Sequence, residues 1–286
     1  MNTDNKYKKI SISLFVLVIS VIGVFLFLNK TEAAVQVQTS SFIKLTTTGS
    51  QSVGNVGFRP SAIIFYSATS TSNSIYSGDL TWGMGFAASS TGITGGAISI
   101  SSEGASAADT YTYVSSTPSI LMLDGLTGAV TASARVTSFD ASGFTLNWDT
   151  SATTAAYIIH YIAIGGADIT NATSGRFAVT PGTGASSTVF GGTGFRPDFL
   201  MLIGSGVTTS TPQQSVAQGG AVFSLGLVAS SAQGSIEQAG WGLMANDANT
   251  ASDSCTTQSA TSAIVIAGPL GTTNCPVTDG LATITS

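Results

Sequence analysis

The chain has 286 residues, of which only 8% are charged, and a formal net charge of −5 at pH 7. Its few basic residues form no cluster behind the N-terminus, which disfavours binding to nucleic acid phosphates. The single histidine and two cysteines are too few for the usual zinc sites.

The N-terminus predicts export. Three lysines precede an uncharged apolar run from Ile10 to Leu28, and small residues follow at Ala33–Ala34. We assign residues 1–34 to a signal peptide cleaved after Ala33 or Ala34 or to a retained N-terminal membrane anchor, and both alternatives stay open. In either case the positive charge before the run sends the rest of the chain outward. We therefore expect a secreted or cell-surface protein that touches the membrane only through residues 10–28, if these remain uncleaved.

The exported part has an all-β pattern. Its apolar bursts have the length of strands and are separated by Gly, Ser, Asn and Asp clusters. Residues Phe144 to Trp148 alternate apolar and polar side chains, which predicts a strand with one solvated face, and Asp140–Gly143 before them has turn chemistry. The runs Ala62–Tyr66 and Phe199–Ile203 predict strands buried on both faces. We expect two tandem, jelly-roll-like β-sandwich domains behind the signal or anchor helix.

A repeated motif marks a duplication. Gly57-Phe58-Arg59-Pro60 and Gly194-Phe195-Arg196-Pro197 each precede an apolar run. Three further pairs of segments match at a slowly increasing spacing: Gly85–Ser90 with Gly226–Ser231, Ser119–Met122 with Ser262–Val265, and Val136–Ser138 with Ile284–Ser286. Such a drift is typical of a duplicated domain that has gained residues in its loops.

The alignment divides the exported chain into four parts: an extended segment at 35–45, a first domain at 46–166, a linker at 167–176 and a second domain at 177–286. Two strands between Phe139 and Gly166 have no counterpart in the second copy. The alternatives are a truncated gene, a second domain built differently, and completion by a strand from a neighbouring subunit. The last predicts self-association through an open edge of the second domain, with Val35–Thr39 as the donor strand.

Four motifs resemble a poorly characterised family of repeated β-domains that occurs in phage virion or tail-associated proteins and in exported bacterial proteins. The motifs are Val56–Pro60, Gly83–Ala87, Ser138–Trp148 and Tyr161–Gly166. They look structural, so the resemblance implies a virion-like or surface structural role and carries over no catalytic residue.

No catalytic, cofactor or metal site is predicted, and we expect no enzymatic activity. The chain has no acid–base constellation and no Gly-x-Ser-x-Gly segment. His160 lies in an apolar run and is expected to be a core or interface residue. Arg59 and Arg196 are expected to be structural, with Asp140 or Asp198 as carboxylate partners.

The sequence also indicates roles for the two cysteines and for three aromatic residues. In an exported chain Cys255 and Cys275 predict a disulfide. Trp82, Trp241 and Tyr76 lie near Gly- or Ser-rich breaks and either close the core or stack on sugars. The expected function is a non-enzymatic structural or surface protein that assembles into a filament or coat. A carbohydrate-binding or adhesin module, with a glycan as partner, is the alternative.

Overall fold

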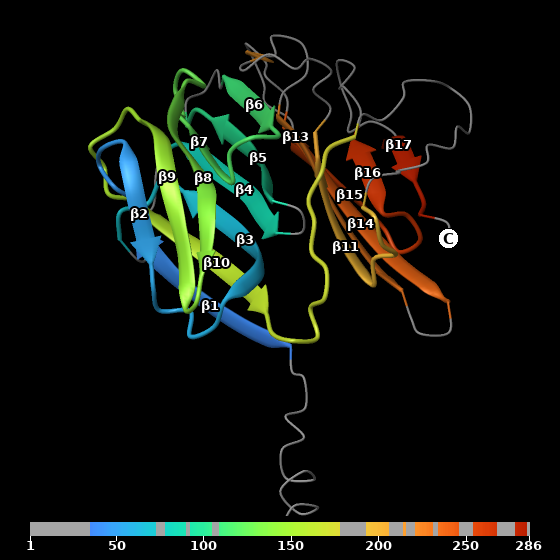
Figure 1. Cartoon of the computed structure of the whole chain (residues 1–286). Coiled ribbons are helices and arrows are strands. Elements are labelled where there is room, and N and C mark those ends of the chain that lie inside the picture. The colour runs from blue at the N-terminus through green and yellow to red at the C-terminus, as the bar shows by residue number, and fades with distance from the viewer. Residues whose placement is uncertain are drawn as a thin grey trace, which may run out of the picture.

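The computed structural model describes residues 35–72, 78–89, 92–104, 109–177, 193–205, 214–215, 221–230, 234–245, 254–267 and 278–284. Every helix or strand assigned in these residues is a β-strand, which confirms the all-β prediction (Figure 1). The predicted signal or anchor at 1–34 lies outside the described residues.

The first sandwich consists of two antiparallel sheets, A and B. Sheet A contains, in spatial order, β1 (Gln36–Ile43), β10 (Ile158–Gly165), β3 (Pro60–Ala68), β4 (Leu80–Ser89), β5 (Ile93–Ser102), β6 (Thr110–Ser115) and β12 (Gln214–Ser215). Sheet B contains β2 (Gly49–Val53), β9 (Gly143–Ser151), β8 (Val130–Asp140) and β7 (Ile120–Leu123). The two-residue strand β12 comes from the second half of the chain and extends sheet A beyond β6.

Apolar side chains fill the space between sheets A and B. Phe144, Leu146 and Trp148 of β9 are at most 1% exposed, and the two residues between them are half-buried, which confirms the predicted alternation. The ring of Phe144 meets those of Phe65 and Tyr161 edge-on, at centroid distances of 5.6 and 5.3 Å. Edge-to-face contacts are a favoured arrangement of buried aromatic rings. This core holds the first sandwich together.

The second sandwich is smaller in the described residues. Sheet C contains β11 (Phe199–Gly204), β13 (Ala221–Ser230), β14 (Ile236–Ala245) and β15 (Ser254–Ser259). Sheet D contains β16 (Ile264–Ala267) and β17 (Thr278–Ala282). Val222 and Met244 of sheet C are buried against Ile266 of sheet D, so this pair of sheets has an apolar core of its own.

The two copies pair their strands in the same register. Phe65 of β3 lies opposite Gly85 of β4, and Leu202 of β11 lies opposite Gly226 of β13. These pairs have the spacings that the repeated motifs predict. Each glycine is also a point of close approach, because a Cβ atom on Gly226 would collide with the carbonyl oxygen of Ala263. The first and second copies therefore share one topology through four strands of a sheet.

The connection from the larger sheet of each sandwich to its smaller partner sheet, from A to B and from C to D, is repeated as well. The backbone N–H of Ser119 donates to the carbonyl of Ala134 at 2.7 Å, and that of Ala263 donates to the carbonyl of Ala282 at 2.8 Å. This shared hydrogen bond aligns Ser119 with Ala263, one residue further on than the sequence alignment placed it.

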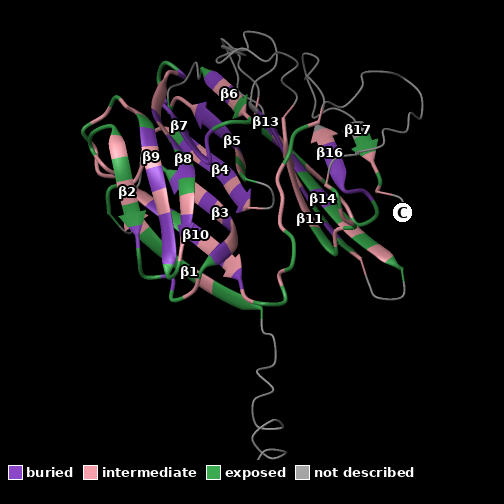
Figure 2. Ribbon diagram, viewed as in Figure 1, coloured by how far each residue is buried: buried purple, intermediate pink, exposed green. Residues whose placement is uncertain are grey.

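The four sheets form a stack in the order B, A, C, D, from left to right in Figure 1. Sheet C packs on the outer face of sheet A, and the strands in the middle of the stack carry most of the buried residues (Figure 2). The two predicted sandwiches thus share an extensive apolar contact between sheets A and C.

The segment predicted to be a free donor strand is part of the first sandwich instead. It forms β1, which pairs with β10 from Gln36 opposite Gly165 to Ile43 opposite Ile158. The prediction that the segment at 35–45 lies outside the first domain, with Val35–Thr39 available as a donor strand, is therefore wrong. Its alternating pattern is that of an edge strand within its own domain.

Candidate functional site: the edge of β11 and the outer face of sheet A

The repeated motif turns the chain at the entrance to β3 and β11. Gly57 and Gly194 have φ angles of +85° and +71°, a region that glycine adopts without strain. Phe58 packs against the core between sheets A and B, and Pro60 is buried as the first residue of β3, where no ladder donor is needed. Pro197 precedes β11 by two residues and is half-buried. These contacts agree with a structural role for the motif.

The motif arginines, Arg59 and Arg196, form no ion pair with Asp140 or Asp198 in the part of the chain that the structure describes. Arg196 instead donates to the hydroxyl of Ser230 at 2.9 Å. Both carboxylate oxygens of Asp140 accept hydroxyl hydrogen bonds of 2.8 Å inside the β8–β9 hairpin. The expected pairing was wrong because the hairpin already satisfies this acid.

The strand β11 has one neighbour where its counterpart β3 has two. β3 lies between β10 and β4, and its Ile63 and Phe65 are 0% and 1% exposed. Among the described strands β11 pairs only with β13. The counterparts of the two buried residues, Leu200 and Leu202, are half-buried, and Phe199 is 56% exposed. The prediction that Phe199–Ile203 is buried on both faces is therefore wrong for this structure, because no described strand covers its outer edge.

The contact between sheets A and C is built from equivalent positions of the two copies. Its apolar cluster contains Ile64, Tyr66, Trp82, Met84 and Ile98 from the first copy and Met201, Ile203, Phe223, Leu225 and Leu243 from the second. By the shared register Trp82 and Phe223 are counterparts, and their rings meet edge-on at a centroid distance of 4.5 Å. Each copy thus offers the same face, as identical subunits do in an isologous contact.

The tryptophans considered for sugar stacking belong to this contact. Trp82 is half-buried against Phe223. Trp241 is 37% exposed, and its ring lies 6.0 Å from Phe223 at an interplanar angle of 64°. The two indoles flank one phenyl ring and form no flat platform, so the geometry favours packing over stacking on a sugar. Tyr76 lies outside the described residues.

His160 points outward from sheet A. It is exposed on β10 between the half-buried Ile158 and Ile162, whereas Ile159 and Tyr161 point into the core. Of the two expected positions, core or interface, the core position is therefore wrong, because the register of β10 places the imidazole on the opposite face from the core, and the interface position stays a prediction.

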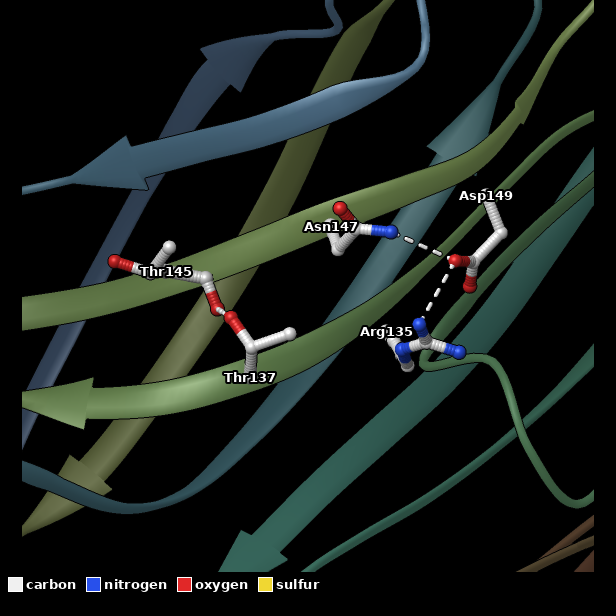
Figure 3. A network of polar contacts seen from close by, with 5 residues as sticks. All are labelled: Arg135, Thr137, Thr145, Asn147 and Asp149. Atoms are coloured by element: carbon white, nitrogen blue, oxygen red, sulfur yellow. Dashed lines mark hydrogen bonds and ion pairs between the residues drawn. The ribbon is translucent and has the colours of Figure 1, made fainter.

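The outer face of sheet B is polar. Asp149 accepts a hydrogen bond from the side chain of Asn147 at 2.7 Å and forms an ion pair with Arg135 at 3.3 Å (Figure 3). Thr137 donates from its hydroxyl to the carbonyl of Thr145 at 3.2 Å. An exposed pair of this kind contributes little to stability, but it keeps the face hydrated. This end of the stack is suited to contact with water.

A buried lysine was not found by sequence reasoning, since nothing distinguishes Lys44 in the sequence. It is 1% exposed, and its Nζ donates to the carbonyl of Leu45, the hydroxyl of Ser151 and the carbonyl of Thr153, at 2.6, 2.8 and 3.3 Å. An ammonium group has three donors, and all three are satisfied. The ring of Trp148 lies 5.6 Å away, and burial lowers the lysine's pKa. This network ties the end of β1 to the end of β9.

No cluster of three metal-ligating side chains was found among the described residues. A shallow open depression lies at one end of sheet A and is lined by Gln36, Arg59, Pro60, Ser61, Ser89 and Gly166. Arg59 is its one charged side chain, which is too little to define a ligand.

Cys255 of β15 is disulfide-bonded, and the only other cysteine of the chain is Cys275, which lies outside the described residues. A search of the described residues for a helix long and apolar enough to cross a membrane found none. No protein-family model, curated protein or solved structure matches this chain.

Proposed function

We propose that this chain is a non-enzymatic structural subunit, secreted or held at the cell surface, that associates with other copies of itself through the outer edge of β11. The observation that carries this proposal is the difference between β3 and β11. The same strand in the same register has two neighbours in the first copy and one described neighbour in the second. The backbone groups along such an edge are available to pair with an added strand.

The composition of β11 supports strand addition. Natural edge strands are often protected by prolines, charged side chains or bulges. The strand reads FLMLIG, with none of these residues, and its pairing with β13 has no register shift. Its Leu200 and Leu202 would also lose exposed surface if a further strand covered them.

The added strand is an exposed edge of another copy rather than a detached N-terminal segment. Donation of residues 35–45 would first break the pairing of β1 with β10. The outer edge of β1 can instead pair while β1 stays in place, since its sequence QVQTSSFI also lacks charge and proline. The leader-like N-terminus and the motifs that resemble those of virion-like and surface proteins support an external structural role.

The test compares two lysine substitutions at equally exposed sites. Phe199 at the start of β11 is 56% exposed, and Leu126 in the β7–β8 connection is 55% exposed. Sedimentation velocity of the full chain in mild detergent should show oligomers for the parent and for Leu126→Lys. Phe199→Lys should give monomers, because a lysine ammonium at a newly formed edge contact would lose its hydration. A monomeric parent, or equal assembly of Phe199→Lys, contradicts the proposal.

A further inference from the structure

The strand β17 of sheet D has an open edge that accompanies the open edge of β11. The backbone hydrogen bond from Ala263 to the carbonyl of Ala282 makes β17 the counterpart of β8. β8 lies between β7 and β9, whereas β17 pairs only with β16 among the described strands. The second sandwich is therefore open at the two positions that β10 and β9 fill in the first. These positions adjoin, because the rings of Phe144 on β9 and Tyr161 on β10 meet at 5.3 Å.

The first sandwich has two open edges of its own, β1 in sheet A and β2 in sheet B. Each has one neighbour among the strands that the structure describes, β10 for β1 and β9 for β2. Gln51 of β2 ties these edges together, since its side chain donates to the carbonyl of Ile43 on β1 at 2.7 Å. The same side chain accepts from the indole N–H of Trp148 at 2.7 Å. β1 and β2 are therefore held as one pair of edges against the core.

The strand directions allow both pairs of edges to meet at once. β1 is antiparallel to β10, which is antiparallel to β3, so β1 runs parallel to β3. In the same way β2 runs parallel to β8. β11 and β17 are the counterparts of β3 and β8. A half-turn about an axis normal to the sheets therefore sets β1 of another copy antiparallel to β11 and β2 of that copy antiparallel to β17.

The spacing between the two layers matches as well. In the first sandwich a Cβ atom on Gly85 would collide with the carbonyl oxygen of Ser119, and in the second a Cβ atom on Gly226 would collide with that of Ala263. Sheets that approach equally closely at equivalent points hold their edges at equivalent spacing. Sheet C can thus continue into sheet A of another copy while sheet D continues into its sheet B.

We propose that the open side of the second sandwich, β11 with β17, binds the β1–β2 side of a second copy through two antiparallel ladders. This inference rests on the proposed function and adds the β17–β2 ladder to it. β2 reads GSQSV, without charge or proline, so its backbone groups can pair. The one charged residue of β17, Asp279, lies at a register shift, and Gly280–Ala282 beyond it pair regularly with β16. Ladders in two layers fix the orientation of the neighbour, which a single ladder leaves free to pivot.

Hydrogen exchange of the full chain in mild detergent, compared between the dilute monomer and the assembled chain, tests both ladders. Amides of β1, β2, β11 and β17 should exchange about tenfold more slowly after assembly, because a paired amide exchanges only when its ladder opens. Peptides from β15, at the opposite edge of sheet C, are the internal control and should not change. Phe199→Lys should remove the added protection from all four strands, since the two ladders form one contact.

Cross-linking tests the β17–β2 ladder by itself. Ser52 on β2 and Leu281 on β17 are both exposed, and their sheets B and D lie at opposite ends of the stack (Figure 1). In a chain with Ser52→Cys and Leu281→Cys, a short bismaleimide that links these two sites must therefore join two chains. The control chain carries Ser52→Cys and Gln258→Cys, because Gln258 is exposed on β15. The first chain should give at least about tenfold more product, since its two strands would be neighbours.

The outcomes separate this inference from the proposed function. Protection of β1 and β11 without β2 and β17 overturns the two-ladder contact and leaves the proposed function standing. Protection of β17 without β2 also overturns the contact, because another strand then covers β17. If the chains associate and β11 gains no protection, the proposed function fails as well. Equal cross-linking of the chains that carry Leu281→Cys and Gln258→Cys would show that β2 does not lie beside β17.

Discussion

Matched alanine substitutions in the two copies test whether sheet C is open in solution. Ile63 of β3 and Leu200 of β11 occupy the same position of the repeat, but Ile63 is 0% exposed and Leu200 is half-buried. Truncation of a fully buried isoleucine costs about 3 kcal/mol, in the middle of the range for such changes. Leu200→Ala should cost about 1 kcal/mol, because part of its side chain already contacts water and less cavity forms.

Hydrogen exchange followed by mass spectrometry is the suitable assay, because the two sandwiches need not unfold together. Ile63→Ala should lower the free energy of opening for peptides from β3 and β4, and Leu200→Ala should do so for peptides from β11 and β13. Measurements at low concentration, where chains are monomeric, keep assembly from masking the difference. Equal losses in the two sandwiches would refute the reasoning, since they would show that Leu200 is as well packed as Ile63.

Two further predictions concern buried groups. Gly226→Ala should lower the stability of the second sandwich by about 2 kcal/mol, because its Cβ would collide with the carbonyl of Ala263. The control is Gly54→Ala, whose Cβ would meet nothing within 4 Å. Thermal unfolding should show a nearly unchanged midpoint for this control. Burial lowers the pKa of Lys44 in the folded chain below the ordinary 10.5. Between the folded and the unfolded pKa the unfolded chain holds a proton that the folded chain has released. In that pH window this group therefore makes the free energy of unfolding rise with pH. Denaturant unfolding across that window should show this rise in the parent relative to Lys44→Met. The raised pKa of Tyr66 acts in both proteins and cancels in the comparison. Identical pH profiles of the two proteins would contradict the assignment.

The parts of the fold that depend on local patterns were predictable from sequence. The alternation around Phe144 identified β9 and its buried face, and Asp140 closes the predicted hairpin. The duplication was visible because equal motifs recur at nearly equal spacing, and the paired registers at Gly85 and Gly226 agree with it. These features can be predicted because each motif or alternation is encoded within a few residues of the chain.

The parts that depend on distant partners were not predictable. The segment at 35–45 was placed outside the first domain, but Gln36 pairs with Gly165, far along the chain. His160 shares an apolar run with core residues, and only the register of β10 decides which face it occupies. The runs in β3 and β11 look alike in sequence, yet one is covered by β10 and the other by no described strand. A short apolar run indicates a strand without identifying what covers it.

The stacking order limits where another copy could bind through apolar surface. Sheet A is covered by sheet B on one face and by sheet C over the centre of the other, and sheet C lies between sheets A and D. The exposed face of sheet B presents the Arg135–Asp149 pair, which favours water over an apolar partner. The edge of β11 is one uncharged, partly exposed surface among the described strands. This edge is open because sheet A continues beyond β3 with β10 and β1, whereas no described strand of sheet C lies beyond β11.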